Sequence, residues 1–284
     1  MRLLAAGAQN VAMIPPTNAL DFPVYQVQAR NFSSEVENRI HNDELASRLG
    51  FEGALVPGVA VFGHLTRPLV DAFGSDWLAT ADSHVRFLKP AYHGDELSIA
   101  SRITHNDTVP RAEVTCHARG QLLATLQTQL GHPESSTHAA TAFSAKVDEG
   151  ERLEINRDVI QLGHRFPDRT WVPSEAENLT YTQQVLDDLP IYTDGWVHPH
   201  LLLSQANTCL THRYEMPAWI HVGSHITSFA GIRVGDEITV RAEPTQVWER
   251  KGHEFVELYI EYRRGETLTT AITHTAIFRI AGTD

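Results

Sequence analysis

The stretch Gly53-Ala-Leu-Val-Pro57-Gly58-Val-Ala-Val-Phe62 returns later in the chain as Gly195-Trp-Val-His-Pro199-His200-Leu-Leu-Leu-Ser204. Two shorter blocks follow each copy: Ser83-His84-Val85 and Gly94-Asp95-Glu96-Leu97 in the first, Ser224-His225-Ile226 and Gly235-Asp236-Glu237-Ile238 in the second. Gly195 follows Gly53 by 142 residues and Ser224 follows Ser83 by 141, so a slip of one residue aligns all the blocks. This period is too long for a solenoid and predicts two copies of one small domain.

The chain is expected to divide into an N-terminal unit at 1–130 and a C-terminal unit at 151–284. Between them, residues 131–150 are rich in Ser, Thr, His and Ala and show no clear period, which is typical of a linker. Each unit is near the size at which a single core becomes self-sufficient.

Each unit reads as a helix followed by a run of strands. Residues 59–73 keep apolar side chains almost all round a helix, which indicates a buried helix, and 201–213 is the matching helix of the second unit. A strand at 24–30 and a short helix at 44–49, ended by Gly50, precede the first of these helices. Alternation and turn residues predict the remaining strands at 83–88, 96–104, 111–118, 122–130, 220–229, 237–248, 254–263 and 267–280.

A buried helix wrapped by one antiparallel sheet is the hot-dog arrangement. The predicted fold class is therefore α+β, a double hot dog in which the two sheets join edge to edge into one continuous sheet. Joining the sheets also removes two exposed strand edges, which is a physical reason for the fusion.

Composition excludes several classes of function. The 284 residues carry 23 basic and 35 acidic side chains, a net charge of −12, which argues against nucleic acid as a partner. Two cysteines, Cys116 and Cys209, are normal for a protein of the reduced cytosol. No apolar run is long enough for a membrane span, and Gln9-Asn10 interrupts the apolar N-terminus, so a cytoplasmic location and no membrane partner are expected.

The segment from Asn38-Arg-Ile-His41 through Gly50-Phe51 to Pro57-Gly58 resembles the signature of the MaoC-like acyl dehydratases and R-specific enoyl-thioester hydratases. The similarity extends to Val85-Arg-Phe-Leu-Lys-Pro90 with Gly94-Asp95. It implies a hydro-lyase that converts a 2-enoyl thioester into a 3-hydroxyacyl thioester, or the reverse. The implied partner is an acyl thioester of coenzyme A or of an acyl carrier protein, no cofactor is expected, and a homodimer is left open.

The resemblance implies roles for residues of the loop before the first buried helix. An Asp and a His of the family hold and activate the water, and His41 and Asn38 match the His and the Asn of the pattern. Val36 stands at the family's Asp position, between Glu35 and Glu37. Glu37 lies four residues before His41 and shares its face in a helical turn, so Glu37 and His41 are the predicted catalytic pair.

Hydration also needs donors aimed at the thioester oxygen as it gains charge. The resemblance gives this role to backbone N–H groups at the start of the buried helix, here Gly58 and Val59, and a helix N-terminus suits it physically. Asn38 is predicted to contact the substrate as well.

The second copy contains nothing that matches 38–41, so the C-terminal unit is expected to keep the fold and lack the catalytic loop. His198-Pro199-His200 takes the place of Val56-Pro57-Gly58 in this alignment, which predicts that His200 lines a shared cleft and binds substrate. The His-x-His spacing suggests zinc, but no Cys or carboxylate at metal-ligand spacing accompanies it, so no metal is expected. His84 and His225 are twins and are expected to fill a structural role.

Three other functions stay open. They are a thioesterase on the same fold, a non-catalytic acyl-binding subunit, which the missing Asp at position 36 favours, and a dehydratase or isomerase of a non-thioester natural product. The fold alone does not decide among them.

Overall fold

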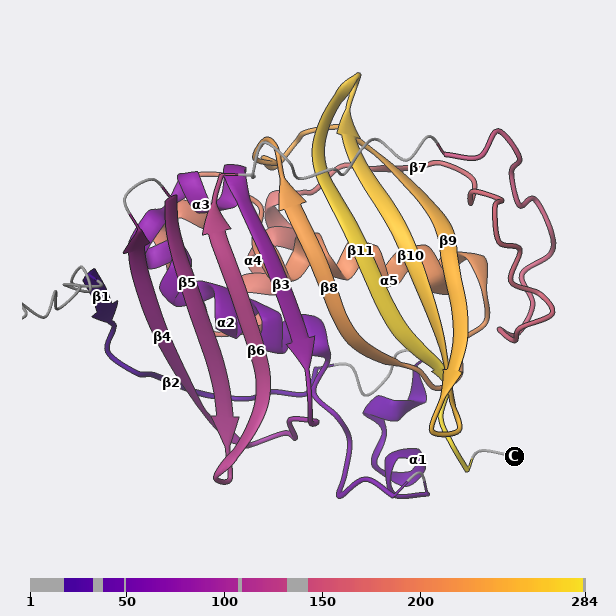
Figure 1. The fold of residues 1–284 in the computed structure, drawn as a ribbon, viewed down its shortest axis with the longest axis horizontal. Coiled ribbons are helices and arrows are strands. Elements are labelled where there is room, and N and C mark those ends of the chain that lie inside the picture. The colour runs from indigo at the N-terminus through magenta and orange to yellow at the C-terminus, as the bar shows by residue number, and fades with distance from the viewer. Residues whose placement is uncertain (1–17, 33–37, 49, 107–108, 132–142, 283–284) are drawn as a thin grey trace, which may run out of the picture.

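The computed structural model describes residues 18–32, 38–48, 50–106, 109–131 and 143–282, and every named strand within them belongs to one sheet (Figure 1). The first unit supplies β1 (Asn18–Asp21), β2 (Tyr25–Gln28), β3 (Ala81–Phe87), β4 (Glu96–Asn106), β5 (Val109–Ala118) and β6 (Gln121–Leu130). The second supplies β7 (Arg169–Trp171), β8 (Ile220–Ser228), β9 (Ile238–Arg250), β10 (His253–Arg264) and β11 (Thr267–Arg279). The strand order is β1-β4-β5-β6-β3-β8-β11-β10-β9-β7, with β2 also paired to β4.

The two units join where β3 pairs antiparallel with β8. In this register His84 stands opposite His225, and Ser83 opposite Ile226. Neither strand is an edge, because β6 covers the other side of β3 and β11 the other side of β8. The predicted double hot dog, an α+β fold with one continuous antiparallel sheet, is confirmed.

Two central helices lie on the same face of this sheet (Figure 1). Helix α2 (Gly58–Phe73) begins after Pro57 and ends at Gly74, whose φ of 56° favours glycine. Helix α5 (Pro199–Arg213) contacts α2, and Gly63 permits this approach, since a Cβ there would lie 3.0 Å from the His200 Cβ. Both helices place buried side chains in the main core between helices and sheet.

Several short elements were not predicted, although the expected β2 and the short helix α1 (Asp43–Arg48) are present. The additions are β1, β7, α3 (Ser75–Thr80), α4 (Glu175–Gln184) and the 3-10 turns Arg39–His41 and Pro190–Tyr192. Most of these are too short for an apolar period. Helix α4 is polar on most sides, and only the Ser174 side chain, which accepts from the Glu177 N–H, indicates its start.

The internal repeat runs at 141 residues without a slip. The bridge between Leu55 and Tyr92 corresponds to the bridge between Trp196 and Arg233, and the helices begin at Gly58 and Pro199. The alignment of Pro57 with Pro199 was therefore wrong by one residue. The sequence alignment paired residues of the same type, Gly53 with Gly195 and Pro57 with Pro199. The backbone pairing instead places Pro199 at the position of Gly58.

The described end of the expected linker packs on the second unit. The Ser144 N–H donates to the Glu243 carboxylate over 2.8 Å, and Asp148 accepts two bonds from the Arg213 guanidinium at 2.8 and 2.6 Å. Across the described ranges, no helix is both long enough and apolar enough to cross a membrane.

Candidate functional site

A cavity of about 370 Å³ opens at the start of α2 and is walled by both units. The first unit contributes the loop before α2, the first turns of α2 and the segment after β3. The second contributes residues of α5, β8, β10 and β11. Its polar or charged lining residues are Asn38, His41, Lys89, Asn207, Trp219, His221 and His253. The other described lining residues are apolar, glycine or proline, so the cavity suits a ligand with a carbon chain.

Asn38 ties the loop of the first unit to the second unit. Its side-chain amide donates to the Trp219 carbonyl over 3.0 Å, and its Oδ1 accepts from the Trp219 N–H over 3.1 Å. The side chain is buried, so these two bonds satisfy groups that would be costly to leave unpaired. Asn38 therefore lines the cavity and also fixes the position of the loop.

His41 presents one ring nitrogen as a base. Its Nδ1 lies 2.7 Å from the Leu55 carbonyl, which only accepts, so Nδ1 carries the hydrogen. Nε2 then holds a lone pair and lies 3.4 Å from the Asn38 side-chain nitrogen. Burial lowers the pKa of His41, against the opposing effect of the Leu55 carbonyl, so the ring is neutral near pH 7 and can accept a proton.

The start of α2 offers two unused donors. The N–H groups of Ala60 and Val61 donate to the Pro57 carbonyl, at 2.9 and 3.2 Å. Within the described residues, no acceptor is paired with the N–H groups of Gly58 and Val59, as is usual at a helix N-terminus. Gly58 lines the cavity, while the Val59 side chain is buried elsewhere, so Val59 is available only through its backbone.

His221 is a cavity residue that the sequence analysis missed. Its Nε2 lies 2.9 Å from the Ser224 hydroxyl, which lies 3.0 Å from Nδ1 of His274. One hydroxyl hydrogen serves only one of these two nitrogens, so the tautomers of His221 and His274 are linked. His221 Nδ1 has no hydrogen-bond partner among the described residues and lies 3.5 Å from where a Cβ on Gly58 would stand.

The imidazoles of His221 and His274 are both neutral. Burial, and then the neighbouring His274, lower the pKa of His221 well below its usual value, with the Gly223 backbone opposing them. Burial lowers the pKa of His274 to about 3. No local sequence pattern predicts these hydrogen bonds, because Ser224 and His274 meet only through the register of β8 and β11.

The prediction that His200 lines the cleft is not supported by its position. It is fully buried away from this cavity, its ring centroid 5.4 Å from that of Phe32 and 4.7 Å from that of Tyr181. In the corrected register His200 corresponds to Val59, so it points into the protein. Its backbone N–H donates to Nδ1 of His198, which caps α5.

The two candidate carboxylates, Glu35 and Glu37, lie outside the described residues. None of the described residues that line the cavity is an Asp or a Glu. The structure thus brings together His41, Asn38 and Gly58 around one cavity and separates them from His200. Val59 follows Gly58 in α2 but does not line the cavity, and the catalytic carboxylate stays a prediction.

No protein-family model matches this chain, and no curated protein matches it either. Several solved structures are similar to it in fold. A MaoC-like dehydratase is 14% identical, with 91% of this chain and 97% of that chain covered and a TM-score of 0.60. A protein assigned as a MaoC-domain dehydratase from Chloroflexus aurantiacus is 13% identical, with 94% and 96% covered and a TM-score of 0.63.

A third structure, Rv0216 from Mycobacterium tuberculosis, is described as a double hot dog. It is 12% identical, with 92% and 96% covered and a TM-score of 0.63. A protein assigned as an oleoyl thioesterase from Lactobacillus plantarum is 10% identical, with 93% and 98% covered and a TM-score of 0.55. The neighbours thus carry both dehydratase and thioesterase names, and what the chain shares with all of them is the double hot-dog fold over nearly its whole length.

Proposed function

We propose that this protein is a hydro-lyase that adds water to, or removes it from, the 2,3-position of an acyl thioester. The observation that carries the proposal is that the neutral His41 and the unpaired amides at the start of α2 lie around one largely apolar cavity. This combination supplies a base for water and donors for a thioester oxygen, which are the two requirements of the reaction.

In the hydration direction, His41 Nε2 and the proposed partner Glu37 hold the water and accept its proton. The resulting hydroxide adds to C3 of the enoyl group, and the π electrons move toward the thioester oxygen. The protonated base then gives this proton to C2, so that one water has been added in all and the base is restored. The Leu55 carbonyl, 2.7 Å from His41 Nδ1, orients this imidazole and leaves the Nε2 lone pair for the water. The Asn38 side chain, 3.4 Å from Nε2, lies beside the place of that water.

The amides of Gly58 and Val59 are the proposed donors to the thioester oxygen. In the tautomer with hydrogen on Nδ1, His221 supplies a third donor from the second unit, and Ser224 then donates to its Nε2. A neutral imidazole suits this role, because it donates without carrying a charge into the cavity.

The proposed substrate is an acyl thioester of coenzyme A or of an acyl carrier protein. The apolar walls, which include Phe51, Val61 and Ile277, favour an acyl chain without charged groups. A cytoplasmic location and a homodimer stay predictions of the sequence.

The test is to mix the protein with a 2-enoyl-CoA and follow both the conjugated absorbance and free thiol. Loss of absorbance without thiol, abolished in His41→Ala, is the expected result. Thiol release would instead establish a thioesterase. Tight binding with neither change would establish an acyl-binding subunit, and both of these outcomes would overturn the proposal.

A further inference from the structure

The seam between the units carries a cluster of three metal-binding side chains on the face of the sheet away from the central helices. Along β3, Ser83 and Val85 face the buried side, while Asp82 and His84 alternate with them on the outer face. His84 and His225 are repeat twins, 141 residues apart, and they stand directly opposite each other in the β3–β8 register. Twins become partners because the pseudo-twofold axis of the duplication passes between them.

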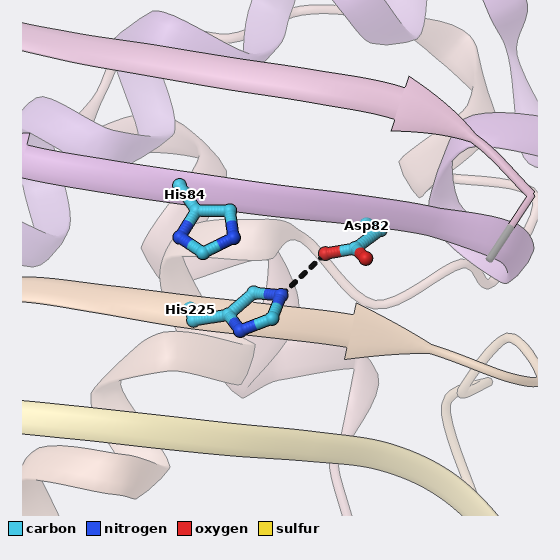
Figure 2. Close-up of side chains that lie close together, drawn as sticks. All are labelled: Asp82, His84 and His225. Carbon is cyan, nitrogen blue, oxygen red and sulfur yellow. Dashed lines mark hydrogen bonds and ion pairs between the residues drawn. The ribbon is translucent and has the colours of Figure 1, made fainter. Parts of the chain in front are cut away.

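The three side chains converge. Figure 2 shows the His84 and His225 rings stacked, with the Asp82 carboxylate turned toward them. The ring centroids are 3.7 Å apart at an interplanar angle of 16°, and His225 Nε2 lies 2.5 Å from Asp82 Oδ1. One possible ligand atom from each residue lies within 4.8 Å of the others, and no other such group of three or more occurs in the described ranges.

We propose that Asp82, His84 and His225 bind a divalent transition-metal ion, for which Zn²⁺ is the natural probe. Two imidazoles and one carboxylate are a ligand set that zinc accepts, with water completing a tetrahedron. Ligands 2.0–2.2 Å from one zinc ion lie about 3.3 Å apart. To complete the site, the His84 and His225 rings turn out of their stack so that one in-plane nitrogen lone pair of each points at the ion. His84 is exposed, which leaves an open path for the ion and its water.

Asp82 and His225 already lie in contact, and the His84 ring is stacked on the His225 ring. A metal ion would take the place of the shared hydrogen and supply positive charge to the mostly buried Asp82 carboxylate. The twin position of Asp82 is Gly223, so the duplicated seam carries one carboxylate and holds one ion.

The ion would link the two units, since Asp82 and His84 come from the first and His225 from the second. It therefore binds the folded chain in preference to the unfolded chain and raises its stability. This inference is independent of the proposed reaction, because the cluster faces away from the helices that carry the cavity.

The experiment uses full-length protein stripped with a chelator and titrated with Zn²⁺ by calorimetry. We expect one ion per chain, a melting temperature that rises with Zn²⁺ concentration, and visible d–d bands of a tetrahedral site with Co²⁺. His84→Ala and His225→Ala should each weaken binding by at least about tenfold and remove most of the rise in melting temperature. Asp82→Asn should also weaken binding.

Two variants control for binding elsewhere. His117→Ala changes a histidine of β5, which β6 separates from β3, and should bind like the wild type. His41→Ala tests the cavity, whose lining includes the three imidazoles of His41, His221 and His253, and this variant should also bind Zn²⁺ like the wild type. Binding lost in His41→Ala, equal binding by wild type, His84→Ala and His225→Ala, or no saturable binding would each overturn the proposal.

Discussion

The start of α2 and the start of α5 occupy equivalent places in the two units, yet only the first opens a large cavity. The counterpart in the second unit has a volume of about 30 Å³ against about 370 Å³. Three lining positions of the first unit carry larger residues in the second, namely Gly58 as Pro199, Val61 as Leu202 and Ala91 as Ile232. Trp77 also packs there. These larger side chains fill space that is open in the first unit, although Phe87 and Trp219, which line the large cavity, correspond to the smaller Ser228 and Leu78.

The two helix starts also differ in the donors they offer. Pro57 and His198 have nearly the same conformation, with φ and ψ of −55° and 133° against −67° and 136°. Pro199 has no N–H, and the N–H of His200 is taken by the His198 side chain at 3.0 Å. The second unit has therefore lost both the space and the donors that a thioester carbonyl would need. The fold is thus preserved in both halves, whereas the open cavity and the unpaired amides occur only at the first of the two helix starts.

Removal of the base should have the largest effect. His41→Ala should lower kcat for 2-enoyl-CoA hydration by about a thousandfold or more, because no other described residue holds a lone pair beside Asn38 in the same position. Stability should fall by less than about 2 kcal/mol, since the variant loses one bond to Leu55 at the cavity wall. Steady-state kinetics and chemical denaturation measure the two effects. Turnover at the wild-type rate would show that His41 is not the base. A much larger loss of stability would assign His41 to the core.

Gly58→Pro should convert the first helix start into a copy of the second. Proline is tolerated at the first position of a helix, and the backbone of Pro57 already suits a following proline. Loss of this single N–H should lower kcat by about a hundredfold to a thousandfold without unfolding the protein. Gly58→Ala is the matched control, because it keeps the N–H and places Cβ in ordinary contact, 3.4 Å from Phe87. Equal losses in both variants would mean that space matters at Gly58 and the donor does not.

The sequence predicted most of the fold because the repeat, the buried helices and the alternating strands are each long patterns. It also predicted that Asn38, His41 and Gly58 share a site. It missed His221 because the bonds to Ser224 and His274 depend on strand register, which no local pattern encodes. It misplaced His200 by a single residue of alignment, and one residue turns a helical side chain by about 100°.

Removal of the Glu37 carboxylate should lower kcat less than removal of the His41 imidazole. If Glu37 serves where the family pattern has an Asp at position 36, Glu37→Gln should lower kcat by about a hundredfold with little change in KM. Glu35→Gln is the matched control and should change little. Val36→Asp combined with Glu37→Gln should recover part of the activity. Full activity in both single variants would remove the loop carboxylate from the reaction and leave His41 with His221.

Buried imidazoles around the second helix start should make the protein sensitive to acid. Burial lowers the pKa of His64 to about 4, with His198 adding to the shift, and burial also lowers the pKa values of His198 and His200. The unfolded chain therefore binds more protons than the native chain between about pH 6.5 and 4, so stability falls as pH falls through this range. His64 alone should make the free energy of unfolding about 2 kcal/mol smaller at pH 5 than at pH 7.

His64→Leu tests this source of acid sensitivity. Its Nδ1 has no partner among the described residues, so a leucine of similar volume breaks no bond there while it removes a group that protonates on unfolding. Denaturation at a series of pH values should show a shallower loss of stability in His64→Leu between pH 7 and 5, by about two thirds of a proton on average. An unchanged slope in His64→Leu would mean that the acid sensitivity comes from other groups, and the buried His221 and His274 beside the open cavity would be tested next. The closed site of the second unit would then be no more acid-sensitive than the open site of the first.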